Sequence, residues 1–326
     1  MNRAALPILP DAERVQVPAS GDLRARAGGA GAHAPAAVSI VVVHYETPAE
    51  LVDCLRSVAA ASEAMPVEVF VIDNASPSFD AAAVTRALPT ANVVRNSTNV
   101  GFARAANQGL RDASGRYLLL LNPDTVLAPE SLELMVEYMD AHPEVGLATA
   151  RLILADGRLD LACRRSFPTP VRSFYRLTLL SRVFPKSRRF AQYNLTYLDE
   201  FAEADIDAPC GAFMIVRTQI REQVGLLDER YFMYGEDLDW AYRIKHAGWR
   251  VMYAPVTTVT HLKHASSRKS RTTTIRAFHD AMRLFYGRWY EARYPRIVSW
   301  MTYGAINIRE ALELASARIS ERRARA

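Results

Sequence analysis

The sequence predicts an α/β protein with a Rossmann-like, mostly parallel sheet flanked by helices. In the first half of the chain, short apolar runs rich in β-branched residues alternate with segments of helical periodicity. Clusters of Asp, Asn and Pro follow these runs, as expected where strands end at a ligand site. With 326 residues, of which 50% are hydrophobic, the chain is long enough to bury a full core.

Four strands and three helices account for this alternation. The strands are expected at residues 38–43 (VSIVVV), 67–72 (VEVFVI), 92–95 and 117–121 (YLLLL). The helices are expected at residues 49–61, 102–112 and 129–142. Continuous apolar runs, rather than alternating ones, indicate strands that are buried on both faces, as in a parallel sheet.

Polar residues stand at the points where the predicted strands end or the next helix begins. They are Asp73, Asn74, Asn99, Gly101, Asn122 and Asp124. Ligands of open α/β sheets bind beyond the carboxyl ends of the strands, so these residues mark a candidate ligand site. There is neither a GxxxxGK(S/T) phosphate loop nor a GxGxxG fingerprint after a strand, which disfavours ordinary ATPases and NAD dehydrogenases. A nucleotide bound through carboxylates and amides, with a metal at its diphosphate, is the class that remains.

Two of these carboxylates have specific candidate roles. Asp124 can bind a hard divalent cation (Mg²⁺ or Mn²⁺), which prefers one or two carboxylates together with phosphate oxygens. The alternative for Asp124 is an ordinary Asx-Pro turn. Asp73 can accept hydrogen bonds from a nucleobase, and its alternative is a helix N-cap or an Asx-turn.

The segment YFMYGEDLDWAYR holds a third group of acids, directly after Gly235 at the start of a helical pattern. Acids in a first helical turn ordinarily satisfy free N–H groups and the helix dipole. Asp239 is also spaced i,i+4 from Arg243, which suits an ion pair. Asp237 follows an aromatic-rich approach that indicates a partly dry cleft wall, where a carboxylate can serve as a general base.

Composition narrows the classes of partner. No apolar run approaches the roughly 18–20 residues of a membrane-spanning helix, and residues 1–36 lack a signal-peptide core, so we expect a soluble or peripheral protein of the cytosol. The net charge is +5, yet residues 262–326 hold 14 Lys/Arg against 5 Asp/Glu and residues 158–189 hold 9 against 1. Such clusters fit phosphates or lipid head groups, and no nucleic-acid recognition motif accompanies them. Three scattered cysteines predict reduced thiols and no zinc site.

Five motifs occur in the order found in a known enzyme family. They are VSIVVVHYETPAELVDCLRSV, VFVIDNAS, NVGFARAANQG, LLLLNPDT and a final segment that runs from MYGEDLDWAYRIKHAGWRVMYAP to TVTH. Together they resemble the family 2 glycosyltransferases with a GT-A fold, especially the bacterial rhamnosyltransferase-like branch, over residues 38–267. The resemblance implies an inverting, metal-dependent hexosyltransferase that uses a nucleoside-diphosphate sugar.

The resemblance also implies roles for particular residues. The positions that match the donor nucleotide site are His44, Tyr45, Glu46, Asp73, Asn74, Asn99, Gly101, Asn107 and Asn122. Asn122-Pro123-Asp124 stands where the family has its DxD motif, with Asp124 as the metal ligand and Asn122 in place of the first acid, so one metal contact is indirect or absent. His261 matches a histidine that completes the metal site, and its alternative is a structural histidine.

The second half of the chain would carry the catalytic base and the acceptor side. Asp237 matches the base, supported by Glu236, and would take the proton of an acceptor hydroxyl as that oxygen displaces the nucleoside diphosphate. The departing diphosphate would be stabilised by the metal and by basic groups. Gly211, Ala212 and Trp240 are expected on the acceptor side, where Gly211 lets substrate approach the backbone.

The chain divides into three expected parts. Residues 1–36 form a flexible extension; residues 37–267 form the transferase domain, with its nucleotide half up to about residue 150; and residues 268–326 form basic amphipathic helices. Within the last part, a helix is expected at residues 273–290. Residues 297–308 are apolar with flanking arginines, which suits an in-plane membrane helix or self-association into a homo-oligomer.

The branch implies dTDP-rhamnose as donor and a glycan or polyprenyl-diphosphate-linked acceptor in bacterial cell-surface polysaccharide synthesis, on the cytoplasmic face of the inner membrane. A UDP-sugar donor is the first alternative. A non-catalytic nucleotide-sugar-binding or scaffold protein is the second, and the presence of Asp73, Asp124 and Asp237 argues against it.

Overall fold

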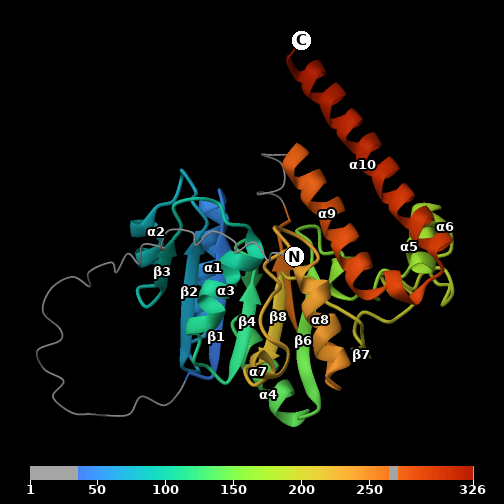
Figure 1. Ribbon diagram of the computed structural model, residues 1–326. Coiled ribbons are helices and arrows are strands. Elements are labelled where there is room, and N and C mark those ends of the chain that lie inside the picture. Colours follow the sequence, from blue (N-terminus) through green and yellow to red (C-terminus); the bar gives the residue numbers. More distant parts are fainter. Residues whose placement is uncertain (1–35, 264–270, 326) are drawn as a thin grey trace, which may run out of the picture.

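A computed structural model describes residues 36–263 and 271–325 (Figure 1). The expected N-terminal extension, apart from Ala36, lies outside these described residues, and so does the expected boundary at residues 267 and 268. The division of the chain into three parts therefore stays a prediction.

The structure is built on one nine-stranded sheet with the order β3-β2-β1-β4-β8-β6-β9-β5, and β7 pairs with the edge of β9. The strands are β1 (Val38–His44), β2 (Val67–Asp73), β3 (Asn92–Arg95), β4 (Tyr117–Leu121), β5 (Thr125–Leu127), β6 (Val145–Ile153), β7 (Ala204–Asp205), β8 (Phe213–Arg217) and β9 (Arg250–His261). All four strands predicted in the first half are present, and two of them extend one residue further than predicted.

The direction of the strands changes across the sheet. β1 to β4 are parallel, as predicted, and their register places His44 beside Asp73. β8 is antiparallel to both of its neighbours, with Phe213 opposite Leu121. The chain therefore enters β8 at the edge where β4 ends, and this entry brings residues 211 and 212 beside Asn122, whose N–H donates to the Ala212 carbonyl (3.1 Å).

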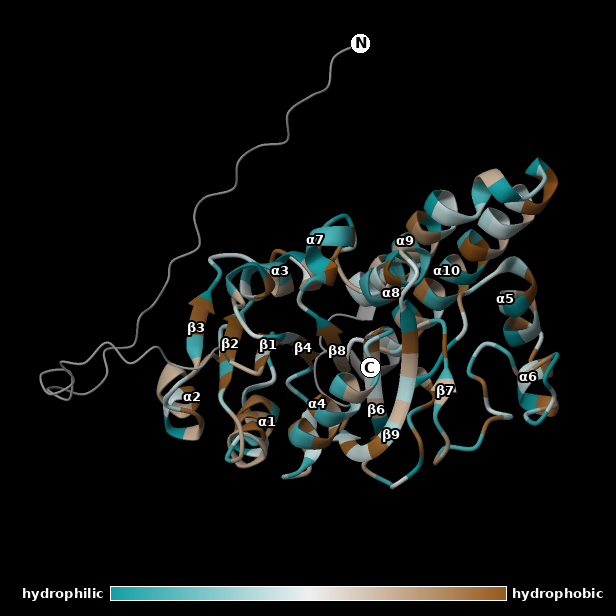
Figure 2. Cartoon of the chain, turned by 90° about the horizontal axis from the view of Figure 1, so that it is seen from below, coloured by the Kyte–Doolittle hydropathy of each residue, from teal (hydrophilic) through white to brown (hydrophobic). Residues whose placement is uncertain are grey.

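Helices cover both faces of the sheet. They are α1 (Pro48–Ala61), α2 (Ala81–Ala87), α3 (Phe102–Asp112), α4 (Ser131–Ala141), α5 (Pro170–Leu177), α6 (Leu180–Val183), α7 (Ile220–Val224), α8 (Glu236–His246), α9 (Arg271–Trp289) and α10 (Arg296–Arg325). Figure 2 shows α1, α2 and α4 on one face, and α3, α7 and α8 on the other. This is the flanked α/β arrangement that the sequence predicted.

Helix α3 lies close to the sheet because of one glycine. A Cβ at Gly109 would be 2.9 Å from a Val41 methyl group and 3.1 Å from the Phe70 Cβ, so a larger residue would push the helix away from β1 and β2. The first residue of α3 stands directly after Gly101, whose φ of +86° is a conformation that side-chain-bearing residues rarely adopt. Gly109 thus fixes the depth of α3, and Gly101 fixes where its first turn points.

The C-terminal helices follow the prediction in position but not in length. The helix expected at residues 273–290 is α9, and the apolar segment at 297–308 is only the first part of the 30-residue α10. Helix α9 packs its Phe285 and Tyr286 into the core beside α8, while α10 projects away from the body of the protein (Figure 1). Within residues 36–263 and 271–325, no helix is both long and apolar enough to cross a membrane.

Candidate active site

We call the place where β1 and β2 end side by side the donor corner, after the role predicted for its residues. The Asp73 carboxylate has no exposed surface, and it accepts hydrogen bonds from the Ser76 N–H (3.2 Å) and the Arg95 Nε–H (3.2 Å). It also contacts His44 Nδ1 (3.0 Å). Because the Thr47 N–H donates to His44 Nε2 (3.1 Å), Nδ1 is the protonated nitrogen and donates to Asp73. The predicted base-binding aspartate is therefore held by three donors.

Asn74 shapes the loop that leads from β3 to α3. Its Nδ2 donates to Asn99 Oδ1 (2.8 Å) and to the Gly101 carbonyl (3.3 Å), and its Oδ1 accepts from the Val100 N–H (3.0 Å) and Asn96 Nδ2 (3.2 Å). The Asn74 side chain is buried, whereas Asn99 is exposed. Asn74 thus orders this loop from beneath, and Asn99 stands on its surface.

Asn107 joins α3 to the segment before α8. Its Nδ2 donates to the Leu227 carbonyl (2.9 Å) and Glu229 Oε1 (3.0 Å), and its Oδ1 accepts from the Leu227 N–H (3.1 Å). The same two parts of the chain meet at the start of α3, where the Phe102 N–H donates to the Phe232 carbonyl (2.6 Å). The NVG motif and the segment that precedes Asp237 are therefore in direct contact.

Asp124 and His261 come together across the β5–β9 pair. His261 Nε2 is 3.4 Å from Asp124 Oδ1, while His261 Nδ1 is 2.9 Å from Asp160 Oδ2. Burial alone would lower the pKa of His261, but the hydrogen bonds with Asp124 and Asp160 outweigh burial and raise it to about 9. Asp160 also accepts from Lys263 Nζ (2.7 Å). Sequence reasoning missed Asp160 in this role, although it is the single acid within the basic stretch 158–189.

The predicted base, Asp237, lies in the first turn of α8 and is almost fully buried. Its Oδ2 accepts from Arg165 Nη2 (2.6 Å) and from the Gly211 N–H (3.3 Å), and its Oδ1 accepts from the Leu238 N–H (2.7 Å). Arg165 also donates to the Pro209 carbonyl. Burial would lower the pKa of Arg165, but the negative charge of Asp237 outweighs burial and holds that pKa above its usual range. No pattern in the sequence pointed to Arg165.

Unlike its neighbour Asp237, Glu236 forms no ion pair with Arg165, although the positive charge of Arg165 lies close enough to act against the rise in its pKa. Its side chain is buried, and its Oε2 has no hydrogen-bond partner within the described residues. Burial and then the negative charge of Asp237 raise the pKa of Glu236 to about 8. At neutral pH Glu236 is therefore mainly protonated, and Arg165 forms its ion pair with Asp237.

A family model described as glycosyltransferase like family 2 matches residues 35–278 of this chain. The chain belongs to this family. The prediction from the sequence motifs is confirmed, and the protein is a glycosyltransferase.

Two curated relatives are rhamnosyltransferases by name. An N-acetylglucosaminyl-diphospho-decaprenol L-rhamnosyltransferase of Mycobacterium tuberculosis is 25% identical over 295 residues, covering 87% of this chain and 95% of that protein. Rhamnosyltransferase WbbL of Escherichia coli strain K12 is 29% identical over 159 residues, covering 48% of this chain and 56% of that protein. The rhamnosyltransferase-like branch named from the motifs is therefore represented among the relatives of this glycosyltransferase.

Solved structures confirm the GT-A fold. The mannosyltransferase PcManGT from Pyrobaculum calidifontis, solved with GDP-Man and Mn²⁺, aligns with a TM-score of 0.52 and 18% identity, covering 88% of this chain and 74% of that chain. GalNAc-T7, solved with UDP, GalNAc and Mn²⁺, aligns with a TM-score of 0.54 and 16% identity, covering 79% of this chain and 48% of that chain. At these identities the likeness concerns the fold of the glycosyltransferase and not its substrates.

The expected acceptor-side residues lie in two different environments. Gly211 and Ala212 stand at the start of β8, and a Cβ at Gly211 would meet Asp237 Cβ and Leu120 Cδ2 only at 4.0 Å. Trp240 is fully buried, and its Nε1 donates to the Gly225 carbonyl (3.0 Å). Trp240 therefore packs in the core that supports α8, and its assignment to the acceptor side stays a prediction.

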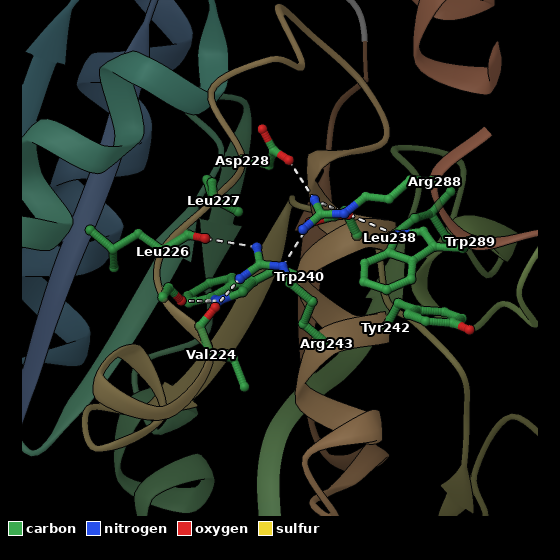
Figure 3. Close-up of polar contacts among 12 residues, drawn as sticks. Val224, Leu226, Leu227, Asp228, Leu238, Trp240, Tyr242, Arg243, Arg288 and Trp289 are labelled. Carbon is green, nitrogen blue, oxygen red and sulfur yellow. Dashed lines mark hydrogen bonds and ion pairs between the residues drawn. The ribbon is translucent and has the colours of Figure 1, made fainter. Parts of the chain in front are cut away.

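Asp239 connects the catalytic helix to α9. Its Oδ2 accepts from Arg243 Nε (2.8 Å), which confirms the predicted i,i+4 pair, and its Oδ1 accepts from Arg288 Nη1 (2.9 Å) and Trp289 Nε1 (2.8 Å). Figure 3 shows Arg243 pointing to the backbone before α8, where it donates to the Leu226 carbonyl (2.7 Å). The start of α8, and with it Asp237, is thus fixed from both sides.

Proposed function

We propose that this glycosyltransferase moves rhamnose from dTDP-rhamnose to a hydroxyl of a glycan or polyprenyl-diphosphate-linked acceptor, with inversion, in bacterial cell-surface polysaccharide synthesis. The observation that carries the proposal is the placement of Asp237 at the start of α8, held by Arg165 and the Gly211 N–H. The choice of sugar and acceptor is supported by the mycobacterial relative, whose similarity covers 87% of this chain.

In this proposal Asp237 is the general base. It accepts the proton of the acceptor hydroxyl while that oxygen attacks the anomeric carbon and the nucleoside diphosphate leaves. Arg165 keeps the carboxylate oriented, and protonated Glu236 leaves the pair of acids with a single negative charge. Gly211 leaves room for the acceptor beside Asp237, because no side chain projects from this position.

We propose that Asp124 and His261 hold a divalent cation, Mg²⁺ or Mn²⁺. Asp160 fixes the His261 ring so that Nε2 faces Asp124, an arrangement typical of a histidine ligand with a supporting carboxylate. No group of three or more His, Cys, Asp or Glu side chains within the described residues is arranged to hold a metal. The two present fit a cation that takes its remaining ligands from a diphosphate and water. Such a cation supplies positive charge to the leaving diphosphate.

The donor site is proposed at the ends of β1 and β2. Tyr45 and Glu46 are partly exposed beside buried Asp73, and exposed Asn99 caps the opposite loop. Asn74 and Asn107 use both ends of their amides on protein partners, so we propose that they position the donor loop rather than contact the nucleotide. Asn122 holds the turn before Asp124 against Ala212, so its backbone joins the donor and acceptor sides.

We also propose that the protein acts at the cytoplasmic face of the inner membrane, with peripheral contact through its C-terminal helices. One face of α10 carries large apolar residues that are all more than half exposed: Ile297, Trp300, Met301, Ile308, Leu312 and Ile319. Because these positions recur at helical spacing, they form one stripe. The alternative use of this stripe is a homo-oligomer, and nucleic acid is not a proposed partner.

The test is a donor panel with the purified protein and a GlcNAc-diphospho-polyprenol acceptor. The donors are dTDP-rhamnose, UDP-GlcNAc, UDP-galactose and GDP-mannose, each with Mg²⁺ and with EDTA, and the product is measured by mass spectrometry. We expect a rhamnosylated product that depends on the metal. A product from a UDP-sugar alone would establish the alternative donor. If no donor gives a product, and none raises the melting temperature, the protein is a non-catalytic scaffold.

A further inference from the structure

The segment between β6 and β7 carries a second exposed apolar surface, separate from α10. We call residues 170–190, which include α5 and α6, the α5–α6 segment. Its large apolar side chains are between 46% and 66% exposed, and they are Val171, Phe174, Leu177, Leu179, Val183 and Phe184. Figures 1 and 2 both place α5 and α6 at the end of the sheet beyond β7, away from the donor corner. Exposed apolar groups in such number mark an interaction surface.

This segment is anchored to the body of the protein. Arg172 donates to Asp207 (3.0 Å) and to Gln192 (3.1 Å), and the Thr169 hydroxyl caps the start of α5. The Phe190 ring packs against the Tyr175 ring, with centroids 5.1 Å apart. The exposed residues therefore project from a fixed platform.

The charge of the segment indicates what covers it. Residues 170–190 contain six Lys and Arg and no Asp or Glu. Three of these cations, Arg182, Lys186 and Arg188, are exposed, and their side chains form no ion pair or hydrogen bond within the described part of the chain. Apolar side chains beside unpaired cations complement a bilayer with anionic head groups. A second copy of the same surface would bring like charges together, which disfavours self-association here.

We propose that the α5–α6 segment docks on an anionic lipid bilayer. The segment begins five residues after Arg165, the partner of Asp237, and the intervening Phe167 packs against Tyr242 of α8 (4.9 Å between ring centroids). Docking would therefore place the bilayer next to the base-bearing side of the sheet. The inference rests on the proposed function, because a lipid-linked acceptor would then reach Asp237 from the membrane surface.

The test is flotation of the purified protein with vesicles of phosphatidylcholine alone or with added phosphatidylglycerol; it needs neither donor nor acceptor, so it can fail while the transferase proposal stands. We expect binding only to the anionic vesicles. The variant Phe174→Ser/Val183→Ser should lower the partition coefficient about tenfold or more, since two apolar side chains no longer enter lipid. Arg182→Glu/Arg188→Glu should lower it by at least about 25-fold, at about fivefold for each lost cation. Phe201→Ser should leave it unchanged, although Phe201 is a more exposed aromatic (69%) than Phe174 (56%).

A second pair of variants separates this surface from α10. Trp300→Ser/Met301→Ser should weaken vesicle binding on its own, and combining it with Phe174→Ser/Val183→Ser should weaken binding further. Melting temperatures confirm that each variant is folded. The proposal is overturned if the wild-type protein does not bind anionic vesicles, or if only the α10 variant loses binding. It is also overturned if Phe174→Ser/Val183→Ser converts an oligomer to a monomer in sedimentation without vesicles, because a second copy would then cover the segment.

Discussion

The donor and acceptor sides of the sheet hold their polar groups in different ways. On the donor side, an amide network around Asn74 lies beside the Arg95–Asp73 ion pair, and the buried atoms without partners within the described residues belong to neutral side chains, Thr47 and Gln108. On the acceptor side, Asp237 and Asp239 form ion pairs with Arg165, Arg243 and Arg288. There the atoms without partners within the described residues include Glu236 Oε2 and Arg165 Nε, which belong to charged side-chain types.

The donor side is thus held mainly by neutral hydrogen bonds, and the acceptor side mainly by charged groups. Neutral amide networks fix geometry with little dependence on pH. Buried ionisable groups make geometry and charge depend on one another, because removing one partner leaves the other charge uncompensated. The acceptor side should therefore respond most strongly to charge substitutions and to pH, and the donor side to steric ones.

The largest expected effect is the loss of stability on removing Asp239, the buried acid of α8 that pairs with two arginines. Asp239→Ala removes the acceptor shared by Arg243, Arg288 and Trp289, so the free energy of unfolding should fall by about 3–5 kcal/mol. Urea denaturation measures this loss. The matched control is Asp205→Ala, because Asp205 pairs with Lys245 and Arg250 on the surface and should cost less than about 1 kcal/mol. Equal losses for the two variants would show that the buried ion pairs of the acceptor side are no more sensitive to substitution than surface ones.

Glu236 should make the stability of the protein depend on pH. The native pKa of about 8 lies above the ordinary 4.5, so the native state binds more protons than the unfolded state between these values. Stability from this group is therefore fully present below about pH 4.5 and is lost as pH rises towards 8. As the pH rises from 5 to 8.5, the free energy of unfolding of Glu236→Gln should increase by roughly 2–4 kcal/mol relative to that of wild type. A constant difference in melting temperature between the two proteins over this range would contradict the assignment.

Arg165 should act through Asp237. Arg165→Ala should lower kcat about 10- to 100-fold, with KM for the donor nearly unchanged, because the carboxylate loses its orienting cation. Arg165→Lys should restore only part of kcat, because it keeps the charge and loses the paired contact with the Pro209 carbonyl. An equal loss of kcat in the two variants would show that the charge of Arg165 does not orient Asp237.

The smallest of these effects tests the donor side, where we expect close packing to matter more than charge. Gly101→Ala would place a Cβ 2.6 Å from the Phe232 carbonyl, in addition to the strain of a positive φ. Gly157→Ala has the strain alone, because the φ of Gly157 is +80° and no atom of the described residues lies within 4 Å of the added Cβ. The difference in unfolding free energy between the two variants should be about 1–3 kcal/mol and should not change with pH. A difference that titrates would show that charge also governs the donor loop.

The sequence predicts the features that depend on neighbouring residues, and it does not predict those that depend on contacts between distant ones. The bounds of α3 and β4 and the site positions after β1, β2 and β4 follow from hydrophobic period and local punctuation, which are properties of neighbouring residues. The bond between Arg165 and Asp237 spans 72 positions, and the one between Asp160 and His261 spans 101, so no local pattern contains them. Trp240 shows the same limit: its place on the helix was predictable, but its burial depends on the loop at Gly225.

The short helix α2 and the antiparallel direction of β8 were also not predicted. Helix α2 has seven residues, too few for a periodic pattern, and its start is set by Asp80 accepting from the Ala83 N–H (3.0 Å). The direction of β8 depends on where the chain re-enters the sheet after β7, which is a tertiary property.

The most direct test of Asp237 as the base is to compare Asp237→Asn with wild type in two measurements on the same preparation. These are turnover of dTDP-rhamnose with the lipid-linked acceptor, and stabilisation of the protein by dTDP with Mg²⁺. We expect turnover to fall by at least about a thousandfold while the nucleotide-induced rise in melting temperature is unchanged, since the base acts on the acceptor and not on the nucleotide. Wild-type turnover by Asp237→Asn would show that another residue is the base.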